Sequence, residues 1–413
     1  MKPTTDGRLI VRPRIDCVPF EFADASDSLT PFPFTQNDPN MMDDETFPRP
    51  VDGLTLPRHF FVSEEIFARE TDRLFHSGWF CVGRRDQLSH PGQYFLAEVA
   101  GENLIVTLDA DDHLHAAFNV CRHRGSRLAT ESAGEFSHCR IRCPYHRWTY
   151  DCGGKLLAAP NMSDHFQAAE WSLHMAAIEV WQGFLFVNLA IHPQPIEEAF
   201  EPFWNQLSDW CTSELKVVRQ EEYELATNWK MVFQNFNECY HCRSVHPGLQ
   251  ELSPVDECSN DFSEGPFLGG PMRLSSESMT TNGKRTAAPI RSLGEEKRER
   301  VYYYTLLPNM LLAMHPDFVL AWRIHPRSPS QTKITAQWLY EPEAIQHSDF
   351  DPRPAIEFWD KTNRQDWAIC QSSYQGIRSK AYVPGPWSPR ESIPQSFDRS
   401  VLDALELSDR SAD

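Results

Sequence analysis

Two short loops that each pair a cysteine with a histidine constrain this chain more than any other feature. The first reads Cys121-x-His123, and the second, Cys143-x-x-His146, follows after nineteen intervening residues. Thiolates and imidazoles grouped in this way are typical metal ligands. Short apolar or alternating runs between residues 80 and 189, separated by Gly, Asp and Pro, indicate that an all-β domain carries both loops.

The pairing of ligands within each loop indicates the type of metal centre. A structural zinc site is the simpler alternative, but zinc fingers usually place their two histidines at helical spacing. Here each histidine shares a tight loop with a cysteine. That is the arrangement of a Rieske [2Fe–2S] centre, in which two thiolates hold one iron and two imidazoles hold the other. We expect Cys139 and Cys152, which lie outside the pattern, to be core or surface thiols.

The same segments resemble a known family. CRHRG and CPYHRWTYDCGG are similar to the C-x-H-R-G and C-P-x-H-x-W-x-Y-x-x-x-G motifs of the Rieske non-haem iron oxygenases. The resemblance implies that Cys121, His123, Cys143 and His146 bind a Rieske [2Fe–2S] cluster.

A second group of candidate ligands lies in FQNFNECYHCRSVHPG, residues 233–248. His241 and His246 are five positions apart, which on an ideal helix separates the rings by roughly 140° beyond one full turn. A loosened or π-type turn is therefore expected to bring them together. Two imidazoles and one carboxylate form the facial triad of non-haem Fe(II) oxygenases. The sequence alone does not choose among the later aspartates, Asp349, Asp351, Asp360 and Asp366.

The resemblance extends to this region. NWKMVFQNFNECYHCRSVHP and NRQDWAICQSSYQGIRS are similar to two stretches of the family's catalytic domain. They imply that His241, His246 and Asp366 bind a mononuclear Fe(II), and that Cys239 and Cys242 do not. The chain departs from the family pattern by having glutamine where an acid is common, at Gln234, Gln365 and Gln371.

Glu238 lies three residues before His241, on the same face of a helix. The resemblance implies that this carboxylate bridges the iron site to a Rieske histidine of a neighbouring subunit. Such a bridge implies head-to-tail association, with a homotrimer and cross-subunit electron transfer as the common form. Glutamate at this position, where most relatives have aspartate, is typical of a branch that includes oxygenases of quaternary ammonium compounds.

Together these features predict an α+β protein. The resemblance implies an all-β Rieske domain and a catalytic domain whose antiparallel sheet is covered by helices, a helix-grip or START-like fold. Ser63 is a candidate N-cap for a helix near residue 64, and residues 258–300 are expected to form a loop or lid. The predicted parts are an extended or disordered arm (1–50), an N-terminal helix on the catalytic domain (51–79), the Rieske domain (80–190) and the catalytic domain (191–413).

The implied chemistry needs partners. Electrons from NAD(P)H would pass through a separate flavin/iron–sulfur reductase to the cluster and then to Fe(II), where O2 is activated. No Rossmann or flavin motif is visible, so the reductase is expected to be another chain.

The substrate class is suggested by residues 301–326, VYYYTLLPNMLLAMHPDFVLAWRIHP, which resemble the quaternary-ammonium branch. We therefore expect hydroxylation or N-demethylation of a small quaternary ammonium compound such as glycine betaine. The alternatives are a ring-hydroxylating oxygenase of an aromatic acid and a non-catalytic Rieske electron carrier.

Aromatic residues in that segment are candidates for binding a cationic substrate. Aromatic rings attract quaternary ammonium groups, and alternate residues of a strand face one side. Tyr302, Tyr304, Phe318 and Trp322 are therefore possible members of an aromatic cage. Each of them is equally well explained as sheet core.

Charge and cysteine content exclude other classes. A net charge of −19 argues against a nucleic-acid partner and against binding to anionic membranes. No apolar run is long enough to span a membrane, and the start of the chain shows no secretory signal. An odd number of cysteines, eleven, in a large chain predicts a reducing, cytoplasmic setting, where clustered Cys and His indicate metal more often than disulfide.

Overall fold

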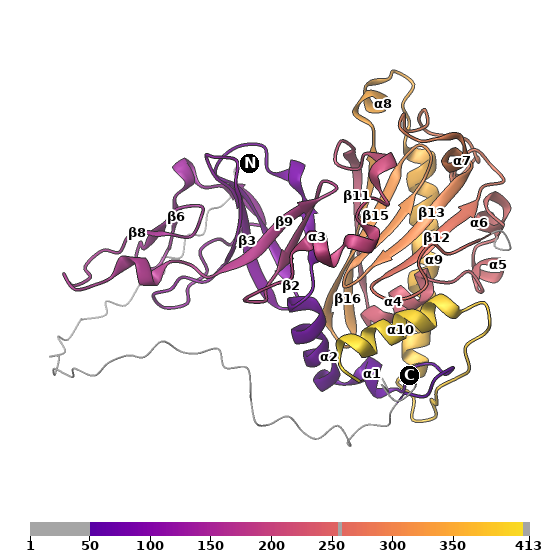
Figure 1. The fold of residues 1–413 in the computed structure, drawn as a ribbon, viewed down its shortest axis with the longest axis horizontal. Helices are drawn as coiled ribbons and strands as arrows, with labels where there is room; N and C mark the ends of the chain where they lie inside the picture. Colours follow the sequence, from indigo (N-terminus) through magenta and orange to yellow (C-terminus); the bar gives the residue numbers. More distant parts are fainter. Residues whose placement is uncertain (1–49, 255–257, 408–413) are drawn as a thin grey trace, which may run out of the picture. The chain divides into compact units, whose positions relative to one another are not determined.

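The computed structural model describes residues 50–254 and 258–407, so the predicted N-terminal arm lies almost wholly outside the described residues. Within that part of the chain the strands form three antiparallel sheets (Figure 1). Two belong to the N-terminal half, with strand orders β1-β10-β9-β4-β3-β2-β5 and β6-β7-β8. The third has the order β11-β16-β15-β14-β13-β12. Helices accompany this third sheet, so the predicted α+β class is confirmed.

The strands of the N-terminal half are β1 (Phe80–Arg84), β2 (Gln93–Val99), β3 (Glu102–Leu108), β4 (Leu114–Phe118), β5 (Ala133–Glu135), β6 (Ile141–Arg142), β7 (Thr149–Tyr150), β8 (Leu156–Ala158), β9 (Met175–Trp181) and β10 (Phe184–Asn188). Those of the C-terminal half are β11 (Lys216–Leu225), β12 (Phe267–Arg273), β13 (Arg300–Leu306), β14 (Met310–Met314), β15 (Val319–Ser328) and β16 (Gln331–Tyr340).

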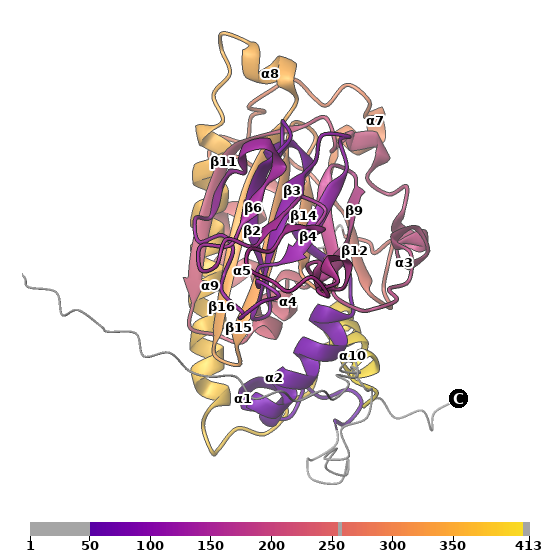
Figure 2. The ribbon, with the colours of Figure 1, turned by 90° about the vertical axis from the view of Figure 1, so that its left-hand side faces the viewer.

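The α-helices are α1 (His59–Val62), α2 (Glu64–Glu70), α3 (Ile196–Ala199), α4 (Trp229–Phe236), α5 (Cys242–Val245), α6 (Pro247–Leu252), α7 (Glu295–Arg298), α8 (Pro342–Gln346), α9 (Arg353–Ile377) and α10 (Ser392–Ala404). Helix α2 is capped as predicted, because the Ser63 hydroxyl accepts hydrogen bonds from the N–H groups of Glu65 and Ile66. Helix α9 runs along the six-stranded sheet (Figure 2) and packs against α4.

Two stretches differ from the sequence expectation. Residues 195–211 look helical but form only α3 and two 3-10 turns, in which Phe200, Phe203 and Trp210 are buried. The predicted loop 258–300 contains β12 and α7. Glycine has a low strand propensity, so the glycines of β12 make this strand hard to predict from the sequence. The fold nevertheless requires glycine at these positions.

Residues 269 and 270 show why glycine is required in β12. A Cβ at Gly269, whose φ is +111°, would lie 2.1 Å from the carbonyl oxygen of Tyr303. A Cβ at Gly270 would lie 2.5 Å from the carbonyl oxygen of Ser259. Gly269 therefore lets β12 run close to the backbone of β13, and Gly270 lets the segment that starts at Cys258 pack closely over the strand.

A buried ion pair joins helix α2 to helix α4. The Lys230 ammonium contacts the Glu70 carboxylate, and both side chains are 0% exposed. The indole N–H of Trp229 donates to the second oxygen of Glu70 at 2.8 Å. The N-W-K triplet at the start of α4 is thus explained, because Asn228 caps the helix and the next two residues satisfy one buried carboxylate.

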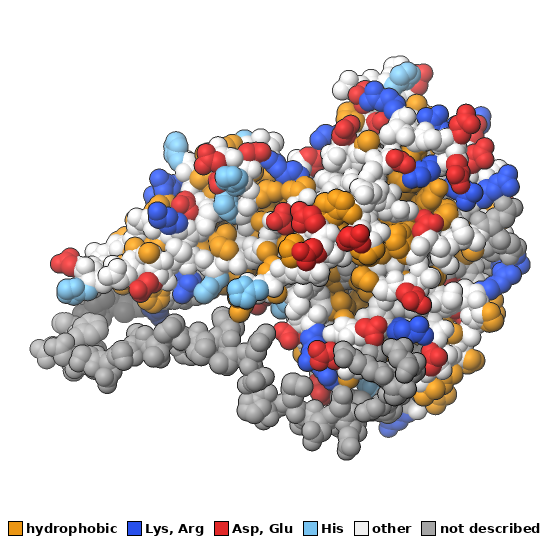
Figure 3. Space-filling view, viewed as in Figure 1, with side chains coloured by type: hydrophobic (Ala, Val, Ile, Leu, Met, Phe, Trp, Pro, Cys, Tyr) orange, Lys and Arg blue, Asp and Glu red, His pale blue; other side chains and the backbone are white. Residues whose placement is uncertain are grey.

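Acidic side chains dominate parts of the surface. Figure 3 shows red side chains gathered over α3, where Glu197, Glu198 and Glu201 are exposed. This patch agrees with the net charge of −19. No helix among residues 50–254 and 258–407 is both long and apolar enough to cross a bilayer.

Replacing Lys230 with methionine should lower the free energy of unfolding by about 3–5 kcal/mol, because the Glu70 carboxylate would stay buried without its partner. Urea unfolding followed by tryptophan fluorescence measures the loss. The double variant Glu70→Leu, Lys230→Met should recover most of it, since the Glu70 carboxylate is then no longer buried without its partner. A loss below about 1 kcal/mol in the single variant would contradict the role of the pair.

Candidate functional site

The segment that carries His241 and His246 is a broken helix. Helix α5 begins just after His241, and His246 interrupts the helical path with φ −123° and ψ 66° before Pro247 begins α6. The break turns the two rings toward each other, with their centroids 5.2 Å apart. Of the two alternatives expected from the sequence, the π-type turn does not form, and the loosened turn takes the form of this helix interruption.

Asp366 of α9 completes a group of three potential ligands. One atom each of His241, His246 and Asp366 lies within 4.8 Å of the other two. Oδ1 of Asp366 lies 2.7 Å from Nε2 of His246 and 3.2 Å from Nε2 of His241. Two imidazoles and a carboxylate converging on one point have the composition of the facial triad that holds Fe(II).

The second nitrogen of each imidazole is also engaged. Nδ1 of His241 donates to Oε1 of Glu238 at 2.5 Å, and Nδ1 of His246 donates to Oε1 of Gln365 at 2.9 Å. An acceptor at Nδ1 fixes the ring orientation and leaves Nε2 to face a metal. Gln365 was noticed in the sequence only as a departure from an acidic pattern, and its contact with His246 could not be read there.

Neighbouring groups set the charge of this site. Burial lowers the pKa of His241, but hydrogen bonds to Asp366 and Glu238 outweigh burial and raise it to about 9. Burial raises the pKa of Asp366, but hydrogen bonds from His241 and His246 hold it below its usual value. The carboxylate is thus ionised, as a metal ligand must be, and a metal would displace protons from the imidazoles.

Glu238 lies in the connection between α4 and α5, so the expected shared helix face with His241 is wrong, although the two side chains still meet. The carboxylate of Glu238 is also held by the backbone. Its Oε2 accepts hydrogen bonds from the backbone N–H groups of Tyr240 and, at 3.2 Å, His241. Its side chain is 12% exposed, so part of the carboxylate reaches solvent.

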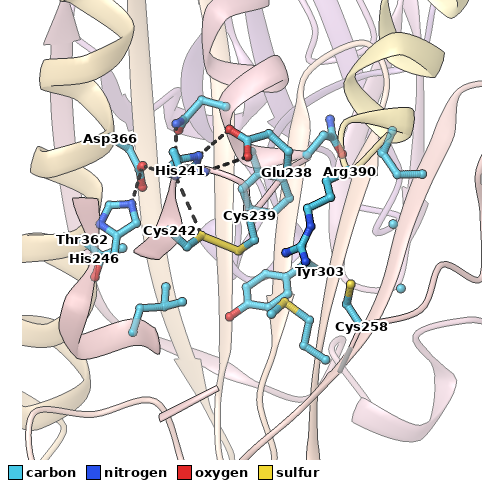
Figure 4. A pocket seen from close by; sticks show the side chains of 18 of the residues that line it. Glu238, Cys239, His241, Cys242, His246, Cys258, Tyr303, Thr362, Asp366 and Arg390 are labelled. Atoms are coloured by element: carbon cyan, nitrogen blue, oxygen red, sulfur yellow. Dashed lines mark hydrogen bonds and ion pairs between the residues drawn. A yellow bond between two sulfur atoms is a disulfide. The ribbon is translucent and has the colours of Figure 1, made fainter. Parts of the chain in front are cut away.

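Cys239 and Cys242, which flank His241, are joined in a disulfide with their Cα atoms 4.9 Å apart (Figure 4). The family resemblance implies that neither cysteine binds the iron, and their disulfide is a pairing that the expected reducing setting did not predict. The pair is local enough to bond because the turn from Glu238 brings residues 239 and 242 together.

The two Cys-His loops of the N-terminal half also converge. Cys121 and Cys143 are 2% and 1% exposed, while His123 is exposed and His146 is half-buried. The two imidazole rings lie 4.5 Å apart between centroids. Trp148 stacks on His123 at 4.9 Å. The thiols thus lie on the inside and the imidazoles on the outside of one small region.

Polar atoms in this region fit a cluster. Nδ1 of His146 is buried and has no hydrogen-bond partner among the described residues, an arrangement that is costly unless a ligand occupies it. Backbone hydrogen bonds shape the loops, from Cys121 N–H to the carbonyl of Ser126 at 2.9 Å and from Cys143 N–H to that of Trp148 at 2.8 Å. Two thiols and two imidazoles match the donor set of a Rieske [2Fe–2S] centre.

A cavity of about 160 Å³ opens beside His241, His246 and Asp366. Its wall includes a cluster of aromatic rings whose centroid separations run from 5.6 Å (Phe236 to Trp322) to 6.2 Å (Tyr303 to Trp359). Four rings belong to this cluster, Phe236, Tyr303, Trp322 and Trp359. We call them the aromatic wall.

The aromatic wall differs from the cage considered from the sequence. Tyr303 and Trp322 lie on one face of the sheet, whereas Tyr304 points to the other face and donates to Asp261 at 2.7 Å. Tyr302 shares that opposite face, and Phe318 stacks on His315 in the core. Of the four candidates, Trp322 belongs to the aromatic wall. On β13 the prediction was wrong by one residue, because Tyr303 faces the cavity instead of Tyr302 and Tyr304. The sequence alone does not supply the register of β13 relative to Trp322.

Comparisons with known proteins agree with this geometry. Residues 78–178 match the Rieske [2Fe-2S] domain, and residues 212–407 match the catalytic domain of the ring-hydroxylating alpha subunit. The glycine betaine monooxygenase oxygenase subunit of Chromohalobacter salexigens is 30% identical over 390 residues, covering 85% of this chain and 84% of that protein. The chloroplastic choline monooxygenase of Amaranthus tricolor is 25% identical over 345 residues, covering 81% and 74%.

A solved structure has a similar fold. A quaternary ammonium Rieske monooxygenase, studied for carnitine oxidation by gut microbiota and inter-subunit electron transfer, superposes with a TM-score of 0.74. The two chains are 23% identical, with 86% of this chain and 95% of the other covered.

Replacing Asp366 with alanine should remove about one iron atom per chain, because the triad loses its only carboxylate. Acid-labile sulfide and the visible absorption of the cluster should stay unchanged. Iron and sulfide analysis of the reconstituted protein measures both.

The matched control is Asp360→Ala on the same helix, where the carboxylate accepts from Tyr223 and pairs with Arg364. That variant should keep its full iron content. Full iron content in the Asp366 variant would contradict the assignment.

Proposed function

The chain belongs to the family of Rieske non-haem iron oxygenases, and from this premise we propose that it hydroxylates or N-demethylates a small quaternary ammonium compound of the glycine betaine type. The aromatic wall beside the three converging ligands carries this proposal.

Family membership confirms the expected enzyme class and cofactors. The chain is the oxygenase subunit of a multi-component oxidoreductase and uses a Rieske [2Fe–2S] cluster and a mononuclear iron. When both centres are loaded, electrons supplied by a reductase allow O2 to be activated at the iron. The non-catalytic carrier considered from the sequence is disfavoured, because residues 212–407 match a catalytic domain.

We assign the ligands as follows. Cys121, His123, Cys143 and His146 hold the cluster, and the unpartnered Nδ1 of His146 supports this assignment. His241, His246 and Asp366 hold the iron, and their convergence within 4.8 Å supports that one. The hydrogen bonds of Glu238 and Gln365 to the far nitrogens of the two imidazoles keep the ligands oriented.

The cavity suits a small cation. Aromatic faces carry negative charge density and attract quaternary ammonium groups, which no hydrogen bond can hold. An engineered cavity of about 150 Å³ holds benzene, so the 160 Å³ found here accommodates a compact molecule. The aromatic acid considered from the sequence lacks the cationic group that the rings of the aromatic wall favour.

The functional assembly is proposed to be a head-to-tail homotrimer served by a flavin/iron–sulfur reductase. The imidazole of His123 is exposed at the surface, so it can reach a neighbouring chain. Both oxygens of Glu238 accept hydrogen bonds within the chain, but its side chain is 12% exposed, and a carboxylate oxygen has more than one lone pair with which to accept from a second imidazole. A carboxylate shared by two imidazoles provides a short hydrogen-bonded path between the two metal centres.

With a surrogate reductase and NADH, the reconstituted protein should release formaldehyde from at least one of glycine betaine, carnitine, stachydrine and choline. Mass spectrometry of the organic product distinguishes demethylation from hydroxylation at another carbon. Benzoate-type acids should yield no hydroxylated product. If an aromatic acid is turned over and no trimethylammonium or dimethylammonium compound is, the proposed substrate class is wrong.

Replacing Glu238 with alanine should keep both metal centres but abolish coupled turnover, because the path between subunits is cut. Stopped-flow absorption of the cluster on mixing reduced protein with O2 and substrate measures its rate of oxidation. Glu251→Ala, an exposed carboxylate on α6, is the matched control and should behave as wild type. Light scattering should give a trimer for all three proteins. Unchanged turnover in the Glu238 variant would contradict the bridge.

A further inference from the structure

We propose that Arg390 binds the carboxylate of a zwitterionic trimethylammonium substrate and thereby makes the enzyme select betaines over choline. This inference rests on the proposed function, in which the aromatic wall takes the cationic end of the substrate. It adds a specificity-determining residue on the side of the cavity away from His246 and Asp366 (Figure 4).

Arg390 lies in the connector between α9 and α10, immediately before α10 begins, and its backbone position is fixed. Its N–H donates to the Ser388 hydroxyl at 3.3 Å, and the N–H of Ser388 donates to the Glu391 carboxylate at 2.8 Å. The N–H of Trp387 donates to the carbonyl of Gly53 at 3.0 Å, which ties the connector to the N-terminal segment. The arginine is therefore presented from an anchored turn.

The side chain of Arg390 lines the mouth of the cavity. Figure 4 shows its guanidinium directed toward Tyr303, on the side away from His246 and Asp366. Among the described residues that line the cavity, Arg390 is the one lysine or arginine. A positive charge thus stands at one end of the cavity, and the metal ligands stand at the other.

The charges that line the cavity match a zwitterion better than a simple cation or anion. A lone anion would gain nothing from the aromatic wall, whereas a lone cation would gain nothing from Arg390. A betaine satisfies both ends, with its methyl groups toward the aromatic wall and the iron ligands and its carboxylate toward the guanidinium. Guanidinium has five N–H donors in a planar fork that fits a carboxylate, so it can hold one beside its contacts within the chain.

Choline lacks the group that this arginine would recognise. Its hydroxyl cannot take the two parallel hydrogen bonds that a carboxylate accepts, and it carries no charge. A charge-assisted hydrogen bond of this kind changes relative binding by about tenfold or more. Arg390 is exposed, so solvent screens its charge. The expected change in relative binding is therefore close to tenfold.

The test compares glycine betaine with its carboxamide, which keeps the shape but loses the negative charge, and with choline. Reconstituted holoenzyme with reductase is assayed for kcat and KM on each compound. Arg390→Gln should lower kcat/KM for glycine betaine about tenfold or more, mainly through KM. The same variant should change kcat/KM for the carboxamide and choline by no more than about twofold. Arg390→Lys, which keeps the charge but not the fork, should fall between wild type and Arg390→Gln.

Arg399→Gln is the matched control, because Arg399 is an exposed arginine of α10 that pairs with Asp52 and does not line the cavity. It should leave the betaine-to-carboxamide ratio unchanged. An equal fall for all three compounds in both Arg390 variants, or no fall for glycine betaine, would overturn the inference. Wild-type preference for choline would overturn it as well. Failure of the wild type to turn over any quaternary ammonium compound would instead overturn the proposed function, and this inference with it.

Discussion

The buried contact between Glu70 and Lys230 is the interaction on which the position of the proposed iron-binding segment depends. Moving two charges out of water is costly, and only close pairing with further hydrogen bonds offsets that cost. The chain meets this condition by placing Trp229 beside Lys230, so that the carboxylate is satisfied at both oxygens. Helix α4 is thereby fixed against the N-terminal helix, and its far end leads within five residues to His241.

Other contacts reinforce the same helix. Phe233 stacks on Phe397 of α10 with centroids 5.2 Å apart. Gln234, which replaces an acid common in the family, donates to the buried carboxylate of Asp398 at 2.6 Å. Burial raises the pKa of Asp398 to about 7, and the neutral amide lets this carboxylate stay in the core without a second negative charge. The departure at 234 therefore belongs to core packing, which explains why it does not touch the iron ligands.

Much of the site could be predicted because its chemistry fixes residue types at short spacing. Each Cys-His loop lies within one short motif of the sequence. Another short motif contains Glu238, His241 and His246. Asp366 needed the family resemblance, since nothing local distinguishes one helical aspartate from another. Three features were out of reach: the helix break at His246, the parity that turns Tyr303 toward the cavity, and the glycine-bearing strand β12. Each depends on contacts between segments far apart in the chain, which no short window of sequence contains.

The cavity is assembled from separate parts of the chain. The imidazoles come from the segment after α4 and the carboxylate from α9, while Arg390 belongs to a connector anchored to residue 53. The side chain proposed to recognise the substrate and the side chains proposed to hold the metals thus belong to separate segments of the chain, so that one can be exchanged while the others are kept.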